Sequence, residues 1–186
     1  MSKDIIELIA KEVKKRVKVL EKELPWFWEK HILVVVEMVE KLCEIIEADK
    51  EICLLSAYLH DIGRVVDMED NHDVAGLPII EEILSGYDYP RDKIEKVKSA
   101  CRSHRCKDVM PKTIEAKVIA SADAMSHLDN DFYFRLLELF FKKMSYDYSI
   151  AKLKEKVERD FNDKIFFKKA KKMVKDKYEA WIKILA

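Results

Sequence analysis

Glycine and proline are scarce in this sequence, with 3 Gly and 4 Pro among 186 residues. Both residue types supply the tight turns that β-rich folds need between strands, so their scarcity argues against an all-β fold. Without a glycine-rich stretch the chain also has neither the P-loop pattern nor the glycine fingerprint of dinucleotide-binding folds, in which backbone amides approach phosphate. Any phosphate bound here must therefore be bound by other groups.

The chain also lacks an excess of charge, because 35 Lys and Arg residues balance 35 Asp and Glu residues. The total therefore indicates neither a nucleic-acid partner nor a membrane partner. No run of about 18 apolar residues could span a membrane, and the charged residues interleaved near the N-terminus are unlike a signal peptide. We expect a cytoplasmic protein. Since no CxxC pair occurs, we expect the cysteines at 43, 53, 101 and 106 to be free thiols.

Helical periodicity dominates what is present. Apolar residues recur at three- and four-residue steps, as on the buried face of a helix, and make up 49% of the chain together with tyrosine and cysteine. We therefore predict an all-α, single-domain helical bundle over residues 1–186. The expected helices cover residues 2–23, 25–46, 49–63, 72–84, 91–104, 113–128, 132–144 and 150–186. Asp49 is the expected N-cap of the third helix.

The end of the chain is basic, with 12 Lys and Arg against 6 Asp and Glu from Ser149 onward. Its apolar residues have helical spacing, so we interpret residues 152–183 as one amphipathic helix that packs on the domain and keeps its lysines in water. Binding of nucleic acid by this face is the less favoured alternative. We assign the aromatic residues within 132–141 to the core.

Histidines and two aspartates stand in an informative order. His31 is followed by the adjacent pair His60-Asp61, then by His72 and His104; Asp123 comes last. Imidazole and carboxylate groups together suit first-row divalent metals, and a helical bundle can bring such groups together in its interior. The order therefore indicates a mixed His/Asp metal site.

Two of these positions have an apolar context. His60-Asp61 ends the apolar segment 53–59, and Asp123 lies within the apolar stretch 118–125. Burying an ionisable group without a partner costs several kcal/mol, and metal ligation is a common remedy. An isolated histidine is more often a hydrogen-bonded structural group than a ligand, so this context is what favours a metal site.

The arrangement resembles the HD domain superfamily of metal-dependent phosphohydrolases. The matching stretches are WFWEKHILVVVEMV around His31, LLSAYLHDIGR with His60 and Asp61, and VIASADAMSHL with Asp123. The resemblance covers an HD core of about residues 25–128, and the helices of 132–186 lie outside it. It implies that His31, His60, Asp61 and Asp123 coordinate a primary metal ion.

Two further histidines fall where binuclear members of the superfamily, such as the HD-GYP phosphodiesterases, carry two more ligands. His72 and His104 are these residues, and the resemblance implies a second ion bridged by Asp61. The ion itself is left open among Mn, Fe, Co, Ni, Zn and Mg, and one or two ions are expected. The GYP motif is missing, and Arg64 replaces the lysine that follows HDIG in those enzymes, which argues against a cyclic dinucleotide substrate.

Four residues near these ligands are candidates for contacts with the substrate. Arg64 follows Asp61 by three residues, so on a continuing helix it lies on the same side and is suited to bidentate contact with phosphate; an ion pair with Asp67 is the alternative. Arg102 and Arg105 flank His104 and can add positive potential. His127 follows Asp123 by four residues and is expected beside the ligands or toward the substrate.

Together these features predict a metal-dependent phosphohydrolase that cleaves a phosphoester of a small phosphorylated molecule, for which we expect a nucleotide. Asp61 and Arg64 are the expected catalytic residues, and a metal-activated water is the expected nucleophile. An HD-type di-iron oxygenase and a non-catalytic module that binds metal or nucleotide are the alternatives. The oligomeric state is left open, with a homo-oligomer among the options.

Overall fold

A computed structural model describes residues 2–68 and 71–186, and every regular element within these ranges is helical. The all-α prediction is therefore confirmed. The α-helices are α1 (Ser2–Val17), α2 (Leu33–Cys43), α3 (Lys50–Leu59), α4 (His72–Gly86), α5 (Arg91–Ser103), α6 (Ile114–Asp129), α7 (Phe132–Phe141), α8 (Tyr146–Arg159) and α9 (Lys168–Ile184). Single 3-10 or π turns extend or join several of them.

Most predicted helices are present, but several end early, and those expected over 25–46 and 132–144 are α-helical only to Cys43 and Phe141. The helix expected over 2–23 is α-helical only to Val17 and continues as a 3-10 turn. The helix expected over 49–63 starts as predicted, with the Asp49 carboxylate accepting from the amides of Glu51 and Ile52, but ends at Leu59. A separate 3-10 turn, η3 (Ile62–Val65), follows it.

The prediction of one long helix over 150–186 was wrong. The structure has two helices there, α8 and α9, joined by the π-helical turn η4 (Asp160–Lys164) and a short extended stretch that begins at Ile165. No glycine or proline marks this break, because tertiary contacts cause it. The Ser121 hydroxyl donates to the carbonyl of Lys164 and accepts from the amide of Phe166, which holds the chain against α6.

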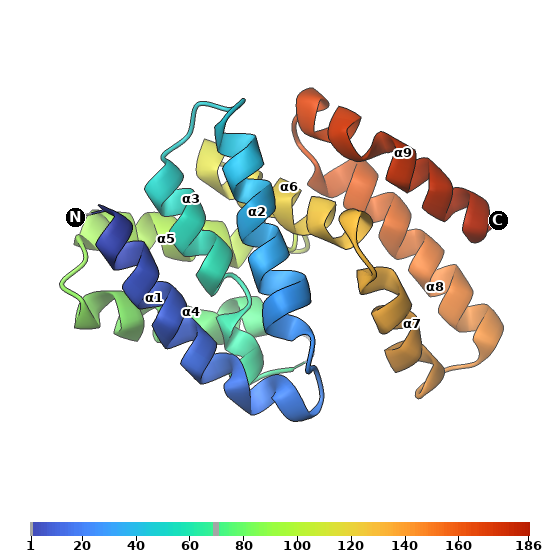
Figure 1. Cartoon of the computed structure of the whole chain (residues 1–186), viewed down its shortest axis with the longest axis horizontal. Coiled ribbons are helices and arrows are strands. Elements are labelled where there is room, and N and C mark those ends of the chain that lie inside the picture. Colours follow the sequence, from blue (N-terminus) through green and yellow to red (C-terminus); the bar gives the residue numbers. More distant parts are fainter. Residues whose placement is uncertain (1, 69–70) are drawn as a thin grey trace.

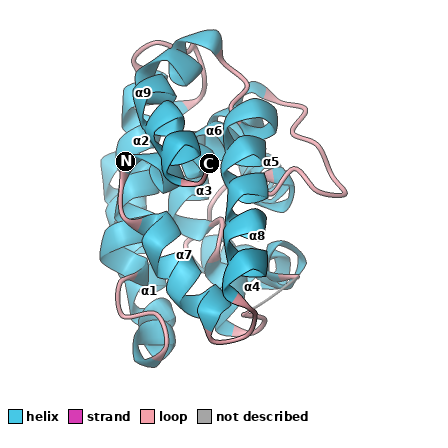
Figure 2. Cartoon of the chain, turned by 90° about the vertical axis from the view of Figure 1, so that its right-hand side faces the viewer, coloured by secondary structure: helices cyan, strands magenta, loops and turns pink. Residues whose placement is uncertain are grey.

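Helix α6 is the centre of the bundle. Every residue from Val118 to Leu128 is buried, and α6 packs against α2, α3, α5, α7 and α9. Small residues such as Ala120, Ala122 and Ala124 let these neighbours approach from all sides. In Figure 1, α1, α3, α4 and α5 lie to one side of α2 and α6, and α7, α8 and α9 lie to the other. Figure 2 views the molecule from the side of the C-terminal helices.

A close contact between Gly63 and Gly76 joins the turn η3 to α4. A Cβ atom on Gly63 would lie 1.9 Å from the carbonyl oxygen of His72 and 2.5 Å from the amide of Gly76. Only glycine therefore fits at position 63 without a backbone shift. This contact sets η3 directly against the first turn of α4, so it places Asp61 next to His72.

Two further expectations concern the chain as a whole. All four cysteines are free thiols, as predicted. Within the described ranges, none of the helices combines the length and the apolar character needed to cross a membrane.

Candidate metal centre

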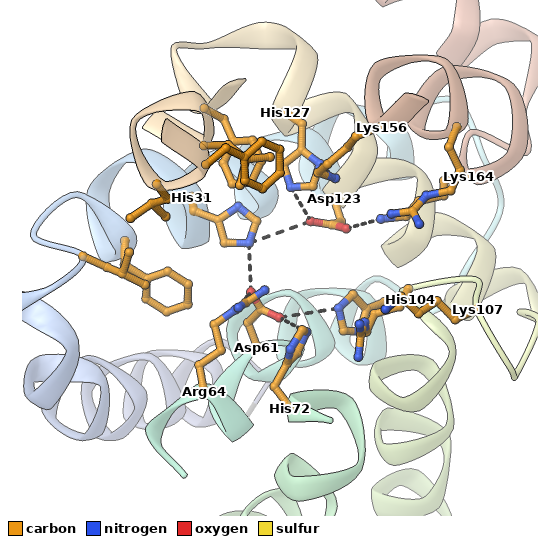
Figure 3. A pocket seen from close by; sticks show the side chains of 18 of the residues that line it. His31, Asp61, Arg64, His72, His104, Lys107, Asp123, His127, Lys156 and Lys164 are labelled. Atoms are coloured by element: carbon orange, nitrogen blue, oxygen red, sulfur yellow. Dashed lines mark hydrogen bonds and ion pairs between the residues drawn. The ribbon is translucent and has the colours of Figure 1, made fainter. Parts of the chain in front are cut away.

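The predicted histidines and aspartates meet in one place although they come from separate elements (Figure 3). His31 lies in the π-helical turn η2 (Trp28–Ile32), which precedes α2. His60 and Asp61 follow α3, His72 is the first residue of α4, and His104 follows α5. Asp123 and His127 lie on α6. All seven side chains are buried.

One group of donor atoms surrounds Nε2 of His31. This nitrogen lies 3.1 Å from Nε2 of His60 and 3.3 Å from Oδ2 of Asp61. Oδ1 of Asp123 lies 3.8 Å from the His31 nitrogen and 3.9 Å from the His60 nitrogen. Two nitrogens and two carboxylate oxygens thus face a common point.

A second group surrounds the other oxygen of Asp61. Its Oδ1 lies 2.9 Å from Nε2 of His72 and 3.5 Å from Nε2 of His104. The two oxygens of one carboxylate therefore face two different donor groups, which is the geometry of a bridging ligand.

Backbone carbonyls orient two of the imidazoles. Nδ1 of His60 lies 2.8 Å from the carbonyl oxygen of Ala57, and Nδ1 of His104 lies 2.6 Å from that of Cys101. A carbonyl only accepts, so Nδ1 carries the proton in both rings and Nε2 presents a lone pair to the cluster. Burial lowers the pKa of His60 to about 3, which favours the neutral form that binds metals.

The donor set fits divalent ions. In the described part of the chain Oδ1 of Asp61 and Nε2 of His72 have no hydrogen-bond partner, although they lie 2.9 Å apart, because their geometry does not suit a hydrogen bond. Three sets of buried groups are close enough to hold an ion: His31–His60–Asp61, Asp61–His72–His104 and His31–Asp123–His127. Buried nitrogen and oxygen atoms that make no hydrogen bond are suited to ligate first-row divalent metals.

Two cations neutralise the two aspartates. Burial would raise the pKa of Asp61, but Arg64 and the nearby histidines hold it well below its usual range. Burial would likewise raise the pKa of Asp123, yet His127 and Lys164 hold it well below its usual range. Both groups are therefore carboxylates.

Lys164 was missed by the sequence interpretation, which placed the C-terminal lysines in water. It is 3% exposed and its Nζ lies 2.6 Å from Oδ2 of Asp123. A local signal exists: Lys164 follows Asp160 by four residues, among the apolar residues Phe161 and Ile165. The same kind of apolar context indicated that Asp123 needs a partner. The context of Lys164 does not identify Asp123 as the residue with which Lys164 pairs.

Asp160 was missed too, and it links the C-terminal helices to α6. Its Oδ2 accepts from Nδ1 of His127 at 2.9 Å, from the Tyr133 hydroxyl at 2.9 Å and from Nζ of Lys156 at 2.7 Å. Asp160 is fully buried; burial would raise the pKa of its carboxyl, but Lys156 and His127 hold it well below its usual range. Residues outside the predicted HD core therefore surround His127.

A cavity of about 490 Å³ opens over the cluster. Much of its lining is cationic, and most of these basic residues come from α8 and η4. The basic residues that line the cavity are Arg64, Arg105, Lys107, Lys152, Lys156, Arg159 and Lys164. Apolar residues also line the cavity, namely Trp26, Phe27, Phe132, Leu136, Leu139 and Phe140. Two of them lie next to lysines: Nζ of Lys156 lies 5.7 Å from the ring centroid of Phe132, and Nζ of Lys152 lies 5.6 Å from that of Phe140.

The assignment of all the aromatic residues of 132–141 to the core was wrong. Among them only Tyr133 is buried, whereas Phe132 and Phe140 line the cavity and Phe134 and Phe141 are 57% and 45% exposed. Helix α7 packs mainly against α6 and α8, and its Tyr133 and Phe134 contact Trp181 of α9. Part of its apolar surface still faces the cavity or solvent.

The basic residues predicted for substrate binding divide into two groups. Arg64 lines the cavity, and its Nε donates to Oδ2 of Asp61 at 2.6 Å although the helix does not continue to it. Arg105 lines the cavity and donates to Asp73 at 2.7 Å. Arg102 also pairs with Asp73, and with Asp108, but it does not line the cavity. The structure therefore does not support direct substrate contact by Arg102.

Comparison with protein families gives one match, the HD domain, over residues 28–128. The chain belongs to the HD domain family. The matched region contains all the histidines and aspartates of the cluster. It ends before α7, so Lys156, Asp160 and Lys164 lie outside the part of this HD domain protein that matches the family.

Three curated relatives were found. The chain is 35% identical over 82 residues to an uncharacterized protein of Clostridium beijerinckii, covering 42% of this chain and 52% of that protein. It is 31% identical over 134 residues to ribonuclease Y of Alkaliphilus metalliredigens, covering 71% of this chain and 26% of that protein. It is 26% identical over 112 residues to tRNA (cytidine(56)-2'-O)-methyltransferase of Picrophilus torridus, covering 54% of this chain and 31% of that protein.

The chain thus spans between about a quarter and about half of the length of these relatives. A search of solved structures found no significant match.

Proposed function

We propose that this HD domain protein is a metal-dependent phosphohydrolase that cleaves a phosphoester of a small phosphorylated molecule, with a nucleotide as the expected substrate. The observation that carries the proposal is the position of Asp61. Its two oxygens face two sets of histidine nitrogens at the floor of a cavity, and cationic side chains line the wall above. The family itself is one of metal-dependent phosphohydrolases, which supports the same reaction class.

The donor set assigns the ligands. His31, His60, Asp61 and Asp123 would hold one divalent ion, and His72, His104 and the second oxygen of Asp61 would hold another. When bound, such ions lower the pKa of a coordinated water toward about 7 and polarise phosphoryl oxygens. Mn, Fe, Co, Ni and Zn accept this ligand set, and Mg is a further candidate that prefers oxygen ligands.

The chain's own residues supply orientation and charge. Arg64 fixes Asp61 through Nε and lines the cavity, so we assign it contact with the phosphate as well as positioning of the bridging carboxylate. Lys164 fixes Asp123 in the same way from the other side. Arg105 adds positive charge at the cavity wall, as its position next to His104 suggested.

Cationic and aromatic side chains lie next to each other in the cavity lining, which supports a substrate with a phosphate and an apolar ring. Lys152, Lys156 and Arg159 recur on one face of α8 and line the cavity. Phe132 and Phe140 of α7 also line it, next to Lys156 and Lys152. A nucleotide combines an anionic phosphate with an aromatic base, and a cavity of about 490 Å³ is of the size that holds a small ligand.

The test is phosphate release from a panel of substrates. The panel holds nucleoside mono-, di- and triphosphates, dinucleotides, simple phosphoesters and, because one relative is named as a ribonuclease, a short oligoribonucleotide. Each is assayed with Mn, Co, Ni, Mg, Zn or Fe for wild type, Asp61→Ala and the control Asp176→Ala, which removes an exposed carboxylate on α9. Metal-dependent release by wild type and by the control, but not by Asp61→Ala, supports the proposal.

Other outcomes replace the proposal with one of its rivals. No release with any ion, together with bound iron and oxygen uptake, would assign the di-iron oxygenase. Full metal occupancy without turnover of any substrate, together with a stable protein partner, would assign a binding module. Equal release by wild type and Asp61→Ala would remove Asp61 from the chemistry.

A further inference from the structure

His127 has the position of a metal ligand that the family's ligand pattern does not include. It follows Asp123 by one helical turn, it is 4% exposed, and its Nε2 lies 3.1 Å from Oδ1 of Asp123. Ligand atoms bound to one ion at about 2.1 Å and at right angles to each other lie about 3 Å apart. The nitrogens of His31 and His60, which are assigned to the same ion, also lie 3.1 Å apart.

The other ring nitrogen of His127 is already paired. Nδ1 lies 2.9 Å from Oδ2 of Asp160, and a carboxylate only accepts, so this hydrogen bond requires the proton on Nδ1. Nζ of Lys156, which can only donate, is farther from Nδ1, at 3.4 Å. Asp160 is itself held in place by Tyr133 and Lys156. A histidine that donates Nδ1–H to a carboxylate presents the lone pair of Nε2, and this arrangement typically orients histidines that bind metals.

Aromatic packing fixes the plane of the ring. The imidazole of His127 stacks on Phe132 with ring centroids 3.9 Å apart and planes inclined by 20°, and it lies nearly parallel to the ring of His31. The ring therefore has little freedom to turn Nε2 away from Asp123. In Figure 3 the ring points toward Asp123 from the side opposite His104.

We propose that His127 is a fifth protein ligand of the ion held by His31, His60, Asp61 and Asp123, and that Asp160 orients it from outside the HD region. The inference rests on the metal site of the proposed function and not on its substrate. It assigns the C-terminal helices a role in metal binding, since Asp160, Tyr133 and Lys156 all follow the residues that match the family.

The alternative is that His127 is a charged imidazolium that donates to both Asp123 and Asp160 and binds no ion. The two arrangements differ at Nε2, which carries a lone pair directed at the ion in the first and a proton in the second. Metal binding measured without substrate therefore separates them.

The experiment uses the full-length protein freed of metal with a chelator. Zn²⁺ affinity is measured by competition with a chromophoric chelator, and the visible absorption of the Co²⁺-loaded protein reports the ligands of the ion. The variants are His127→Gln and Asp160→Asn, with Asp147→Asn as a control because it makes the same change at an exposed carboxylate on α8. Circular dichroism of the metal-free proteins checks that each is folded.

The proposal predicts that His127→Gln lowers the Zn²⁺ affinity of the site formed by His31, His60, Asp61 and Asp123 at least about 10-fold and changes the Co²⁺ spectrum. Loss of an outer partner of a ligating histidine weakens metal binding by about 10–100-fold, so Asp160→Asn should lower affinity by about 10-fold while Asp147→Asn stays unchanged. Wild-type affinity and spectrum in folded His127→Gln would overturn the proposal and leave the imidazolium.

Should His127→Gln fail to fold, Asp160→Asn decides: an unchanged affinity in that variant overturns the proposal. A wild-type protein that binds none of the ions would overturn the proposed function together with this inference. Binding by wild type that His127→Gln does not affect would overturn this inference alone.

Discussion

Nζ of Lys164 lies 2.6 Å from Oδ2 of Asp123, across 41 residues of sequence, and neither side chain is more than 6% exposed. The pair joins the central helix of the HD region to a turn that the family match does not cover. It places a fixed positive charge beside a carboxylate that we assign to the metal, so the stability of the protein should depend on Lys164.

Replacing Lys164 by Met should destabilise the metal-free protein strongly. The substitution leaves the buried carboxylate of Asp123 without its counter-charge, and breaking a buried pair in this way costs about 3–5 kcal/mol. A divalent ion at Asp123 would supply part of the lost charge, so the deficit should shrink when metal is added.

Urea denaturation of wild type and Lys164→Met with chelator and with Zn²⁺ measures both effects. Lys175→Met, at an exposed position on α9, is the matched control and should change stability by less than about 0.5 kcal/mol. If Lys164→Met loses the same stability relative to wild type with and without metal, Asp123 does not bind the ion.

Gly63→Ala should disturb the second donor group more than the first. The added Cβ would lie 1.9 Å from the carbonyl of His72, so α4 must move, and such overpacking costs about 1–3 kcal/mol or more. His72 moves with α4, whereas His31 and Asp123 do not depend on this contact. Metal analysis should find one ion fewer per chain than in wild type, if wild type holds two.

Gly86→Ala is the control for that change, because nothing lies within 4 Å of a Cβ atom at this position. It should bind metal as wild type does. A Gly63→Ala protein with unchanged metal content and stability would show that the contact does not determine the position of His72.

Arg105 and Arg102 should differ in their effect on catalysis. Arg105 lines the cavity and Arg102 does not, although both pair with Asp73. We expect Arg105→Gln to raise KM about 10-fold, as loss of a charged contact with phosphate would, and Arg102→Gln to leave KM within about 2-fold. Steady-state kinetics on the substrate that the phosphate-release panel identifies provide the measurement, and equal KM effects would contradict the assignment.

The stability contributed by Glu51 should depend on pH. Its carboxylate accepts from the Tyr89 hydroxyl at 2.6 Å and from Nζ of Lys93 at 2.8 Å, and the hydrogen bond from Lys93 is the largest cause of its lowered pKa. A carboxyl whose pKa is lower in the folded state stabilises the protein above its unfolded pKa, near 4.3, and loses that contribution as the pH falls through the folded value.

Glu51→Gln should therefore cost about 1–2 kcal/mol at pH 7 and progressively less below pH 4. Urea denaturation of the metal-free wild type and variant at several pH values gives the difference directly. A difference that stays constant down to pH 3 would mean that the charge of Glu51 does not contribute.

Two of the stretches that hold candidate ligands could be predicted from the sequence because they have a strong local signal. His60 and Asp61 end a run of buried residues, and Asp123 interrupts another, so both stretches show ionisable groups that need a partner. The helical periodicity that carries these residues is equally local. That they come from separate helices does not weaken the prediction, because the HD pattern supplies their association.

The C-terminal helices could not be predicted in the same way. Residues 150–186 have helical spacing throughout, and nothing in their composition marks the break at η4. The break arises because Ser121 binds the backbone on both sides of Ile165, a contact that exists only after α6 is buried. Tertiary contacts here override a continuous helical preference.

The sequence by itself thus determined the all-α class, the order of the ligands and the family, since helical spacing and a short motif are properties of neighbouring residues. Only the tertiary structure decided which charges enter the site. Lys164 and Asp160 are buried because η4 and α9 pack on α6. Arg102 does not line the cavity because the packing of α5 against α4 sets which side of α5 reaches it. Charge alone cannot distinguish a lysine in water from one that neutralises a buried carboxylate.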